Sequence, residues 1–225
     1  MMFDPLYLIL VMPALLFSMW AQHHVTSSFK TYSRQRTRNG LTGARAAQEI
    51  LQRAGVSGVR IERVNGNLTD HFDPRDNVIR LSESVYDVPS VAAVGVAAHE
   101  AGHAIQYAHG YAPMQLRAAI IPITSLGSKL SIPLIIIGFL VGMTGLVNLG
   151  ILLFGAVVLF QLITLPVEYN ASNRAIEALE GSALLARDEV PASKKVLSAA
   201  ALTYVGALAV SLAQLIYFVS IFRQR

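Results

Sequence analysis

Three long stretches without a single Lys, Arg, Asp or Glu constrain the fold of this chain more than any other feature. They cover residues 5–29, 130–167 and 196–222 and contain 25, 38 and 27 residues. A helix needs about 20 mostly apolar residues to cross the hydrocarbon core of a bilayer, because each residue adds about 1.5 Å. The first and last stretches therefore predict one transmembrane helix each, and the middle stretch predicts two.

The middle stretch is interrupted at Asn148 and Gly150. They divide its apolar run into two segments of about 17 residues, which can each span a bilayer if their ends are extended. We therefore expect a tight hairpin at this point. Buried core helices of a soluble protein are the alternative. Only 14% of the residues are charged, against roughly 25% in ordinary soluble domains, which disfavours that alternative.

The basic residues are distributed unevenly. Sixteen of the 18 Lys and Arg residues lie between the first and second or between the third and fourth predicted spans, and two lie at the C-terminus. The positive-inside rule then predicts both large polar segments in the cytoplasm and both termini outside. This distribution favours contact with the anionic headgroups of a lipid bilayer and predicts no nucleic-acid partner. Asp4 is the only charge before the first stretch, which therefore reads as a retained anchor.

Weaker periodic patterns occur in the polar segments. They predict helices over residues 41–54, 90–109 and 167–186, a helical segment over 116–129, and strands over 59–64 and 78–81. Thr42 is the expected N-cap of the first helix. Pro166 and Pro191 are expected to separate the third helix from the flanking spans. The segment between the strands is rich in Asn, Gly, Asp and Pro, which predicts a long turn over 65–77.

One motif carries specific chemistry. Residues 99–103 read H-E-x-x-H on a predicted helix. His99 and His103 differ by only about 40° around that helix, one turn apart, so both imidazoles can reach a single Zn²⁺ ion. Glu100 points to the neighbouring face, where its carboxylate can act as the catalytic general base without being a ligand. The chain has no cysteine, so a thiolate zinc site is excluded.

Glu168 is the favoured third zinc ligand. It is the first charged residue after the middle stretch and opens the third predicted helix. The small residues Ala171, Ser172 and Ala175 share its helical face and would let another helix approach closely. Two His and one Glu form the zinc site of thermolysin-type peptidases. Ser172, four residues after Glu168, is a candidate support for one of the ligands.

Two other histidines compete for the third position. His109 stands where the metzincin pattern has its third His, but that pattern requires Gly where this chain has Gln106. On an unbroken helix, His109 would also lie about 120° from His103 and face away from the metal. His71 lies in the predicted turn and is the second alternative.

Taken together, these residues resemble the YugP-type neutral zinc metallopeptidases of bacterial membranes. The resemblance covers nearly the whole chain and is carried by residues 41–44 (LTGA), 66–75 (GNLTDHFDPR), 78–82 (VIRLS), 98–106 (AHEAGHAIQ) and 165–169 (LPVEY). It implies a membrane peptidase with His99 and His103 as metal ligands and Glu100 as the catalytic acid and base. Analogy with the distantly similar CAAX prenyl and heat-shock membrane proteases favours Glu168.

The chain departs from these relatives at two positions. Asn170 stands where the family more usually has an acidic residue, and Ser172 stands where the heat-shock relatives carry Asp. The departures concern the surroundings of the site, and the metal ligands are unaffected.

The predicted fold is a mainly α membrane protein with about four transmembrane helices and a cytoplasmic, zincin-like α+β catalytic portion with a short β-sheet. Its expected parts are the first span (1–22), the catalytic segment (23–129), the transmembrane hairpin (130–166), the helix with the third ligand (167–195) and the last span with its tail (196–225). The predicted function is hydrolysis of peptide or protein substrates, membrane proteins included, at the cytoplasmic surface of a bacterial plasma membrane.

Two rival functions are weighed against this prediction. The first is a site-2-type intramembrane zinc protease, whose H-E-x-x-H lies inside a span, but that class recruits an Asp from a later span and no charge-free stretch contains one. The second is a non-enzymatic membrane scaffold with a structural zinc site. Such a site is closed by four side chains, and the sequence offers three good ones.

Overall fold

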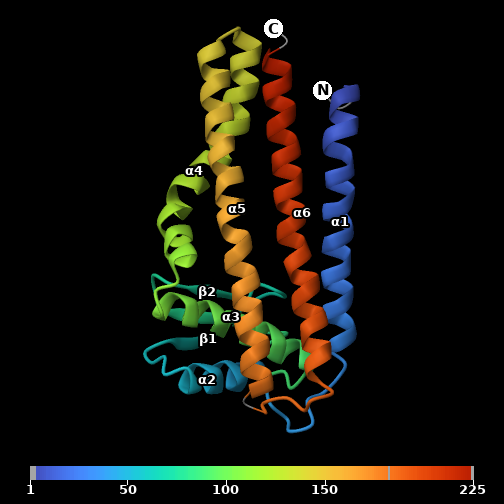
Figure 1. The fold of residues 1–225 in the computed structure, drawn as a ribbon, viewed down its shortest axis with the longest axis vertical. Coiled ribbons are helices and arrows are strands. Elements are labelled where there is room, and N and C mark those ends of the chain that lie inside the picture. The colour runs from blue at the N-terminus through green and yellow to red at the C-terminus, as the bar shows by residue number, and fades with distance from the viewer. Residues whose placement is uncertain (1–3, 182, 224–225) are drawn as a thin grey trace. The chain divides into compact units, whose positions relative to one another are not determined.

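The computed structural model describes residues 4–181 and 183–223. Figure 1 traces its elements, which follow in the order α1 (Pro5–Tyr32), α2 (Gly43–Arg53), β1 (Arg60–Val64), β2 (His71–Asp73), β3 (Val78–Ser82), α3 (Val91–Ala108), α4 (Ala112–Val141), α5 (Thr144–Gly181) and α6 (Val190–Arg223). Four of these helices, α1, α4, α5 and α6, are long and apolar enough to cross a membrane. The prediction of a mainly α membrane protein with four spans and a short sheet is confirmed.

The hairpin between the second and third spans is not where the sequence predicted it. Helix α4 ends at Val141, Gly142 turns the chain with φ +70°, and α5 begins at Thr144. The backbone N–H of Met143 donates to the Gly138 carbonyl at 2.9 Å, which closes the end of α4. The predicted break at residues 148–150 is therefore wrong.

Gly150 allows two helices to pack closely. A Cβ atom at this position would lie 2.7 Å from both the Ser131 carbonyl oxygen and the Ile135 side chain of α4. Asn148 and Gly150 are both part of regular α5. Here the glycine within the helix allows close helix packing. The sequence pattern alone does not distinguish such a glycine from one that ends a helix.

The prolines also differ from their predicted roles. Helix α5 runs through Pro166 without interruption and ends at Gly181. A proline removes one helix hydrogen bond, and the bonds of the flanking turns hold this helix together. Pro191 lies in the first turn of α6, where its missing N–H leaves no bond unmade. The predicted third helix is therefore the C-terminal part of the third span, and Pro191 opens the last helix.

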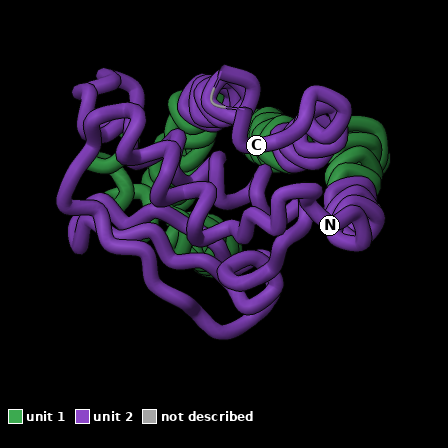
Figure 2. Tube along the Cα trace, turned by 90° about the horizontal axis from the view of Figure 1, so that it is seen from below, with its two compact units in different colours: residues 1–21, 116–165, 202–225 green, residues 22–115, 166–201 purple. Residues whose placement is uncertain are grey.

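The chain forms two compact units, which Figure 2 colours green and purple. The first unit comprises the chain up to Ala21, Leu116–Leu165 and the chain from Leu202 onward. Its core contains side chains from all four long helices: Val11, Ile135, Phe154, Val158, Tyr217 and Phe218. The second unit comprises Gln22–Gln115 and Pro166–Ala201, so each long helix contributes residues to both units.

The second unit contains the sheet, in the order β1-β3-β2. Strand β3 is parallel to β1 and antiparallel to β2, and Ile79 of β3 is in register with Ile61 and Phe72. Strand β2 lies inside the segment predicted as a turn. The Phe72 ring packs 5.9 Å from the Tyr107 ring of α3, which directs this face of β2 toward α3.

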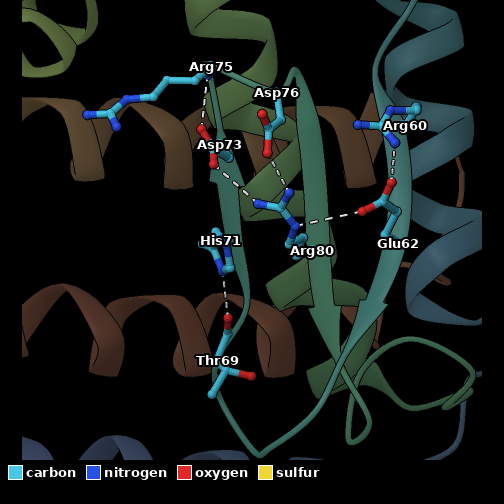
Figure 3. A network of polar contacts seen from close by, with 8 residues as sticks. All are labelled: Arg60, Glu62, Thr69, His71, Asp73, Arg75, Asp76 and Arg80. Atoms are coloured by element: carbon cyan, nitrogen blue, oxygen red, sulfur yellow. Dashed lines mark hydrogen bonds and ion pairs between the residues drawn. The ribbon is translucent and has the colours of Figure 1, made fainter.

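The opposite face of the sheet carries a charged network, shown in Figure 3. The Arg80 guanidinium on the central strand contacts the carboxylates of Glu62 at 3.7 Å, Asp73 at 3.2 Å and Asp76 at 2.7 Å. A hydrogen bond from the Arg75 backbone N–H, together with Arg80, holds the pKa of Asp73 below its usual value. Arg80 thus joins β3 to both edge strands, β1 and β2, and to the turn between β2 and β3.

The pKa of Asp70 is shifted in the direction opposite to that of Asp73. Burial raises the pKa of its carboxyl group, although the backbone N–H of Ser82 donates to it at 2.7 Å and the Ser82 hydroxyl at 3.0 Å. These bonds attach the segment before β2 to the end of β3.

Helix α3 occupies the centre of this unit. Ser90 caps it by accepting the Ala93 backbone N–H at 3.2 Å, as expected of an N-cap serine. Nearly every α3 side chain up to Gln106 is buried, and α2 packs on this helix. Thr42 occupies the N-cap position of α2 as predicted, but its side chain makes no capping hydrogen bond.

Candidate metal centre

Helix α3 places His99 and His103 on one face, one turn apart. Their ring centroids lie 4.6 Å apart, with the rings edge to face. His103 is 6% exposed, and His99 is partly buried. Two imidazole rings in this arrangement can bind the same ion through one nitrogen each.

Glu168 of α5 approaches both rings. Its Oε2 lies 3.1 Å from His99 Nε2 and 3.4 Å from His103 Nε2, and the residue is only 1% exposed. The three potential ligand atoms lie within 4.8 Å of one another. Within the described residues, this is the group of three or more His, Cys, Asp or Glu side chains that could hold a metal ion.

Gly102, inside the motif, permits this approach. A Cβ atom at Gly102 would lie 2.6 Å from the carbonyl oxygen of Ala171, so α3 and α5 could not be this close with a larger residue there. Ala171 and Ala175 are fully buried, in agreement with the small-residue face expected beside Glu168. The short distance between the two backbones brings the carboxylate to the histidines.

The remaining ring nitrogens of both histidines have partners. His99 Nδ1 lies 3.1 Å from the Ser172 hydroxyl, and His103 Nδ1 lies 3.0 Å from the Gln106 amide oxygen. Both rings therefore turn Nε2 toward Glu168. Two imidazoles, each with its Nδ1 atom hydrogen-bonded, and one carboxylate form a set of ligands that suits Zn²⁺. One ligand charge against two on the ion leaves a net positive charge at the site.

The other residues predicted from the sequence lie beside this group or away from it. Glu100 is buried on α3, directly after His99, as the motif requires. His109 is exposed at the C-terminal end of α3, and His71 is exposed on β2 with Nδ1 2.8 Å from the Thr69 carbonyl oxygen. Neither belongs to the metal-binding group. Because Phe72 faces α3, its neighbour His71 points to the opposite face of the sheet.

Three residues beside the site were not predicted from the sequence as contributors. They are Gln106, Asn170 and Arg174, which form a chain of hydrogen bonds that reaches His103. Gln106 follows His103 by three residues, a spacing that places both side chains on one helix face. That spacing was the available signal for Gln106.

Comparison with known proteins agrees with this geometry. Residues 7–223 match the model of a family described as "Putative neutral zinc metallopeptidase". The chain is 46% identical over 217 residues to a Bacillus subtilis (strain 168) protein named "Putative membrane protease YugP", and the match covers 96% of each chain. No solved structure matches the chain. The resemblance stated from the motifs is confirmed, and the chain belongs to this neutral zinc metallopeptidase family.

Proposed function

We propose that this protein is a membrane zinc metallopeptidase that hydrolyses peptide bonds at the cytoplasmic surface of a bacterial plasma membrane. The observation that carries the proposal is the convergence of His99 and His103 of α3 with Glu168 of α5, which is 65 positions beyond His103 in the sequence. Glu100 is buried on α3 directly after His99. Structural zinc sites use four protein ligands, whereas catalytic sites use three and keep one position open. The described group has three members and therefore fits a catalytic site.

The chain's own residues have distinct roles in this proposal. His99, His103 and Glu168 would hold the metal. Bound zinc would favour ionisation of a water molecule and polarise the scissile carbonyl. The Glu100 carboxylate accepts the proton of the attacking water and then delivers it to the nitrogen of the leaving amine, so that one water is consumed for each bond cleaved.

The proposed location follows from the distribution of charge. The second unit contains 14 of the 18 basic residues, which supports a cytoplasmic position. Helix α3, which carries the motif, is not one of the four helices apolar and long enough to span a membrane. Peptides or proteins that reach this side, including loops of membrane proteins, are therefore the proposed substrates.

Glu100→Gln is the direct test of the proposal. We expect the detergent-solubilised variant to keep its zinc, measured by atomic absorption, and to lose hydrolysis of a mixture of quenched fluorescent peptides. The matched control is Glu177→Gln, an exposed carboxylate on α5, which should keep both. Retained hydrolysis in Glu100→Gln would remove Glu100 from the mechanism, and equal loss of zinc and activity would make it a ligand or a structural residue.

Natural substrates can be sought with the same variant. Membranes that contain the active protein and membranes that contain Glu100→Gln should be compared by quantitative proteomics. Substrates should accumulate uncut in the second sample, and their cleavage sites should lie in cytoplasmic segments. Cleavage sites confined to segments outside the cytoplasm would contradict the proposed location.

A further inference from the structure

A cavity of about 580 Å³ lies in the second unit, where α5 ends and α6 begins. Its lining comes from the end of α5 (Glu180), from the connection between the helices (Leu185, Arg187) and from the start of α6 (Val190, Pro191, Lys194). We call it the connection cavity. None of these residues belongs to the group that could hold a metal ion. The cavity is therefore separate from the candidate metal centre.

The connection between α5 and α6 is fixed to another part of the chain. Glu189 is buried, and its two carboxylate oxygens accept the backbone N–H groups of Arg38 at 2.9 Å and Ala186 at 2.8 Å. Asn39 Nδ2 donates to the Leu184 carbonyl at 2.9 Å. These bonds hold the backbone around the two connection residues that line the cavity. The wall of the cavity is thus formed before any ligand binds, which lowers the entropy cost of binding.

Apolar side chains form the deeper part of the lining. Leu185 is 3% exposed and Val190 is 5% exposed, and Pro191 follows Val190 in the first turn of α6. A ligand that covers these side chains with apolar groups gains from the hydrophobic effect. A cavity of this volume is in the range that holds small-molecule ligands. We therefore expect a small ligand with an apolar body.

Charged side chains of opposite sign line the same cavity. Glu180, Arg187 and Lys194 are all exposed, and among the residues that the structure describes none of the three takes part in an ion pair. Asp188, the acid next to Arg187, pairs with Arg38 instead. Two cations and one anion in this arrangement are complementary to a ligand with a negative end and a positive end.

We propose that the connection cavity binds short peptides whose amino group and carboxylate are both free and charged. The peptide carboxylate accepts hydrogen bonds from Arg187 and Lys194, and the peptide amino group donates to Glu180. Apolar side chains of the peptide cover Leu185 and Val190. The choice of peptides among zwitterions rests on the proposed function, because hydrolysis of a peptide bond creates one new amino group and one new carboxylate.

The probe for this site is the tripeptide Ala-Leu-Leu with both ends free, N-acetylated or C-amidated. Its binding is measured by isothermal titration calorimetry in detergent solution, with the full chain carrying Glu100→Gln so that the probe is not consumed. We expect each cap to weaken binding roughly 10-fold, because it removes a charge-assisted hydrogen bond. The assay records binding and not hydrolysis, so it gives an answer even if the proposed function fails.

Substitutions in the lining show which end of the peptide binds where. Glu180→Gln should weaken binding of the free peptide roughly 10-fold, and acetylation should then cause little further loss. Arg187→Met combined with Lys194→Met should weaken it by at least as much, and amidation should then cause little further loss. Coupling of this kind between a cap and a substitution is the mark of direct contact.

Two matched controls come from the same helices. Lys195→Met removes an exposed basic side chain next to Lys194 that does not line the cavity. Glu177→Gln removes another exposed carboxylate of α5, which lines a different cavity together with Arg53. Both variants should bind the free peptide as tightly as the parent chain. Thermal unfolding of each variant shows whether it is folded.

Three results would overturn the inference. The first is a folded parent chain that does not bind the free peptide at millimolar concentration. The second is a loss of binding in Lys195→Met or Glu177→Gln as large as the loss in the lining variants. The third is unchanged binding in the folded lining variants, or losses from caps and substitutions that simply add, because the peptide would then bind elsewhere on the protein.

Discussion

Glu168 is the residue on which the proposed zinc site depends most, because it comes from a different helix than the two histidines. Its Oε2 lies within 3.4 Å of both rings and is shielded from solvent. His109, the competing residue in the sequence, is exposed at the end of α3. Removing a charged ligand should weaken metal binding more than removing any group outside the site.

We therefore predict opposite outcomes for two substitutions. Glu168→Ala should reduce zinc affinity by more than the roughly 10–100-fold loss typical of outer partners, whereas His109→Ala should leave it near normal. Zinc content after dialysis against a weak chelator distinguishes the two variants. If His109→Ala lost the metal and Glu168→Ala kept it, the metzincin-like assignment would replace ours.

The sequence predicted the members of the site more readily than their surroundings. His99, Glu100 and His103 follow from a local motif, and Glu168 follows from its place after a charge-free stretch. Gln106 and Asn170 are 64 positions apart in the chain and meet only because α3 and α5 pack together. A local pattern contains no signal for such a pair, although the spacing of three residues from His103 places Gln106 itself on the face of that histidine.

At the scale of elements, the contact between α3 and α5 at Gly102 decides whether the site can form. A methyl group there would lie 2.6 Å from the Ala171 carbonyl oxygen, a backbone atom that cannot move alone. Overpacking of this kind costs about 1–3 kcal/mol. That exceeds the gain of about 1 kcal/mol or less from placing Ala instead of Gly in a helix.

Gly102→Ala should therefore lower the thermal stability of the protein and its zinc content together. Gly155→Ala on α5 is the matched control, since a Cβ atom at Gly155 meets nothing within 4 Å. The control should be neutral or slightly stabilising, because alanine favours helix. A Gly102→Ala variant with wild-type stability and full zinc occupancy would show that the helices are not limited by this contact.

The sheet network gives a prediction about acid. The pKa of Asp73 is held below its unfolded value by the Arg75 backbone N–H and by Arg80. A lowered folded-state pKa stabilises the fold above the unfolded pKa of about 3.9, and this stabilisation is lost as pH falls through the folded-state pKa. Asp73→Asn should therefore be less stable than the wild type near neutral pH, and the difference should shrink below pH 4.

Urea unfolding monitored by circular dichroism at pH 7 and at pH 3 would measure this change. Asp87→Asn is the control, because Asp87 is exposed and lies outside the network around Arg80. A stability difference between wild type and Asp73→Asn that was the same at both pH values would contradict the prediction.

The boundaries of elements were harder to predict than their presence. Charge-free stretches and apolar spacing predicted the four long helices, α2, α3 and two strands. They did not place the α4–α5 turn, because Gly150 serves helix packing and Gly142 serves the turn, and both appear in the sequence as a glycine in an apolar run. Strand β2 has three residues and pairs with β3, and it was hidden in a segment of turn-forming residues.

At the scale of the whole molecule, the second unit is assembled from distant parts of the chain. One end of each long helix belongs to the first unit and the other end to the second unit, as Figures 1 and 2 show together. A continuous helix such as α5 can thus carry a membrane-spanning stretch and a candidate metal ligand. The sequence predicted both parts but separated them at Pro166, because proline is usually a helix boundary.

The orientation of this molecule in the membrane is the last prediction, and the absence of native cysteine makes it directly measurable. The 16-to-2 distribution of basic residues predicts that the β1–β2 connection lies in the cytoplasm and the α4–α5 turn outside. Single cysteines at Asn67 and at Met143, both exposed, therefore report opposite sides. A membrane-impermeant maleimide added to intact cells should label Met143→Cys and not Asn67→Cys, and inverted vesicles should give the reverse. Labelling of Asn67→Cys from outside intact cells would place the second unit, with its candidate metal centre, on the outer surface.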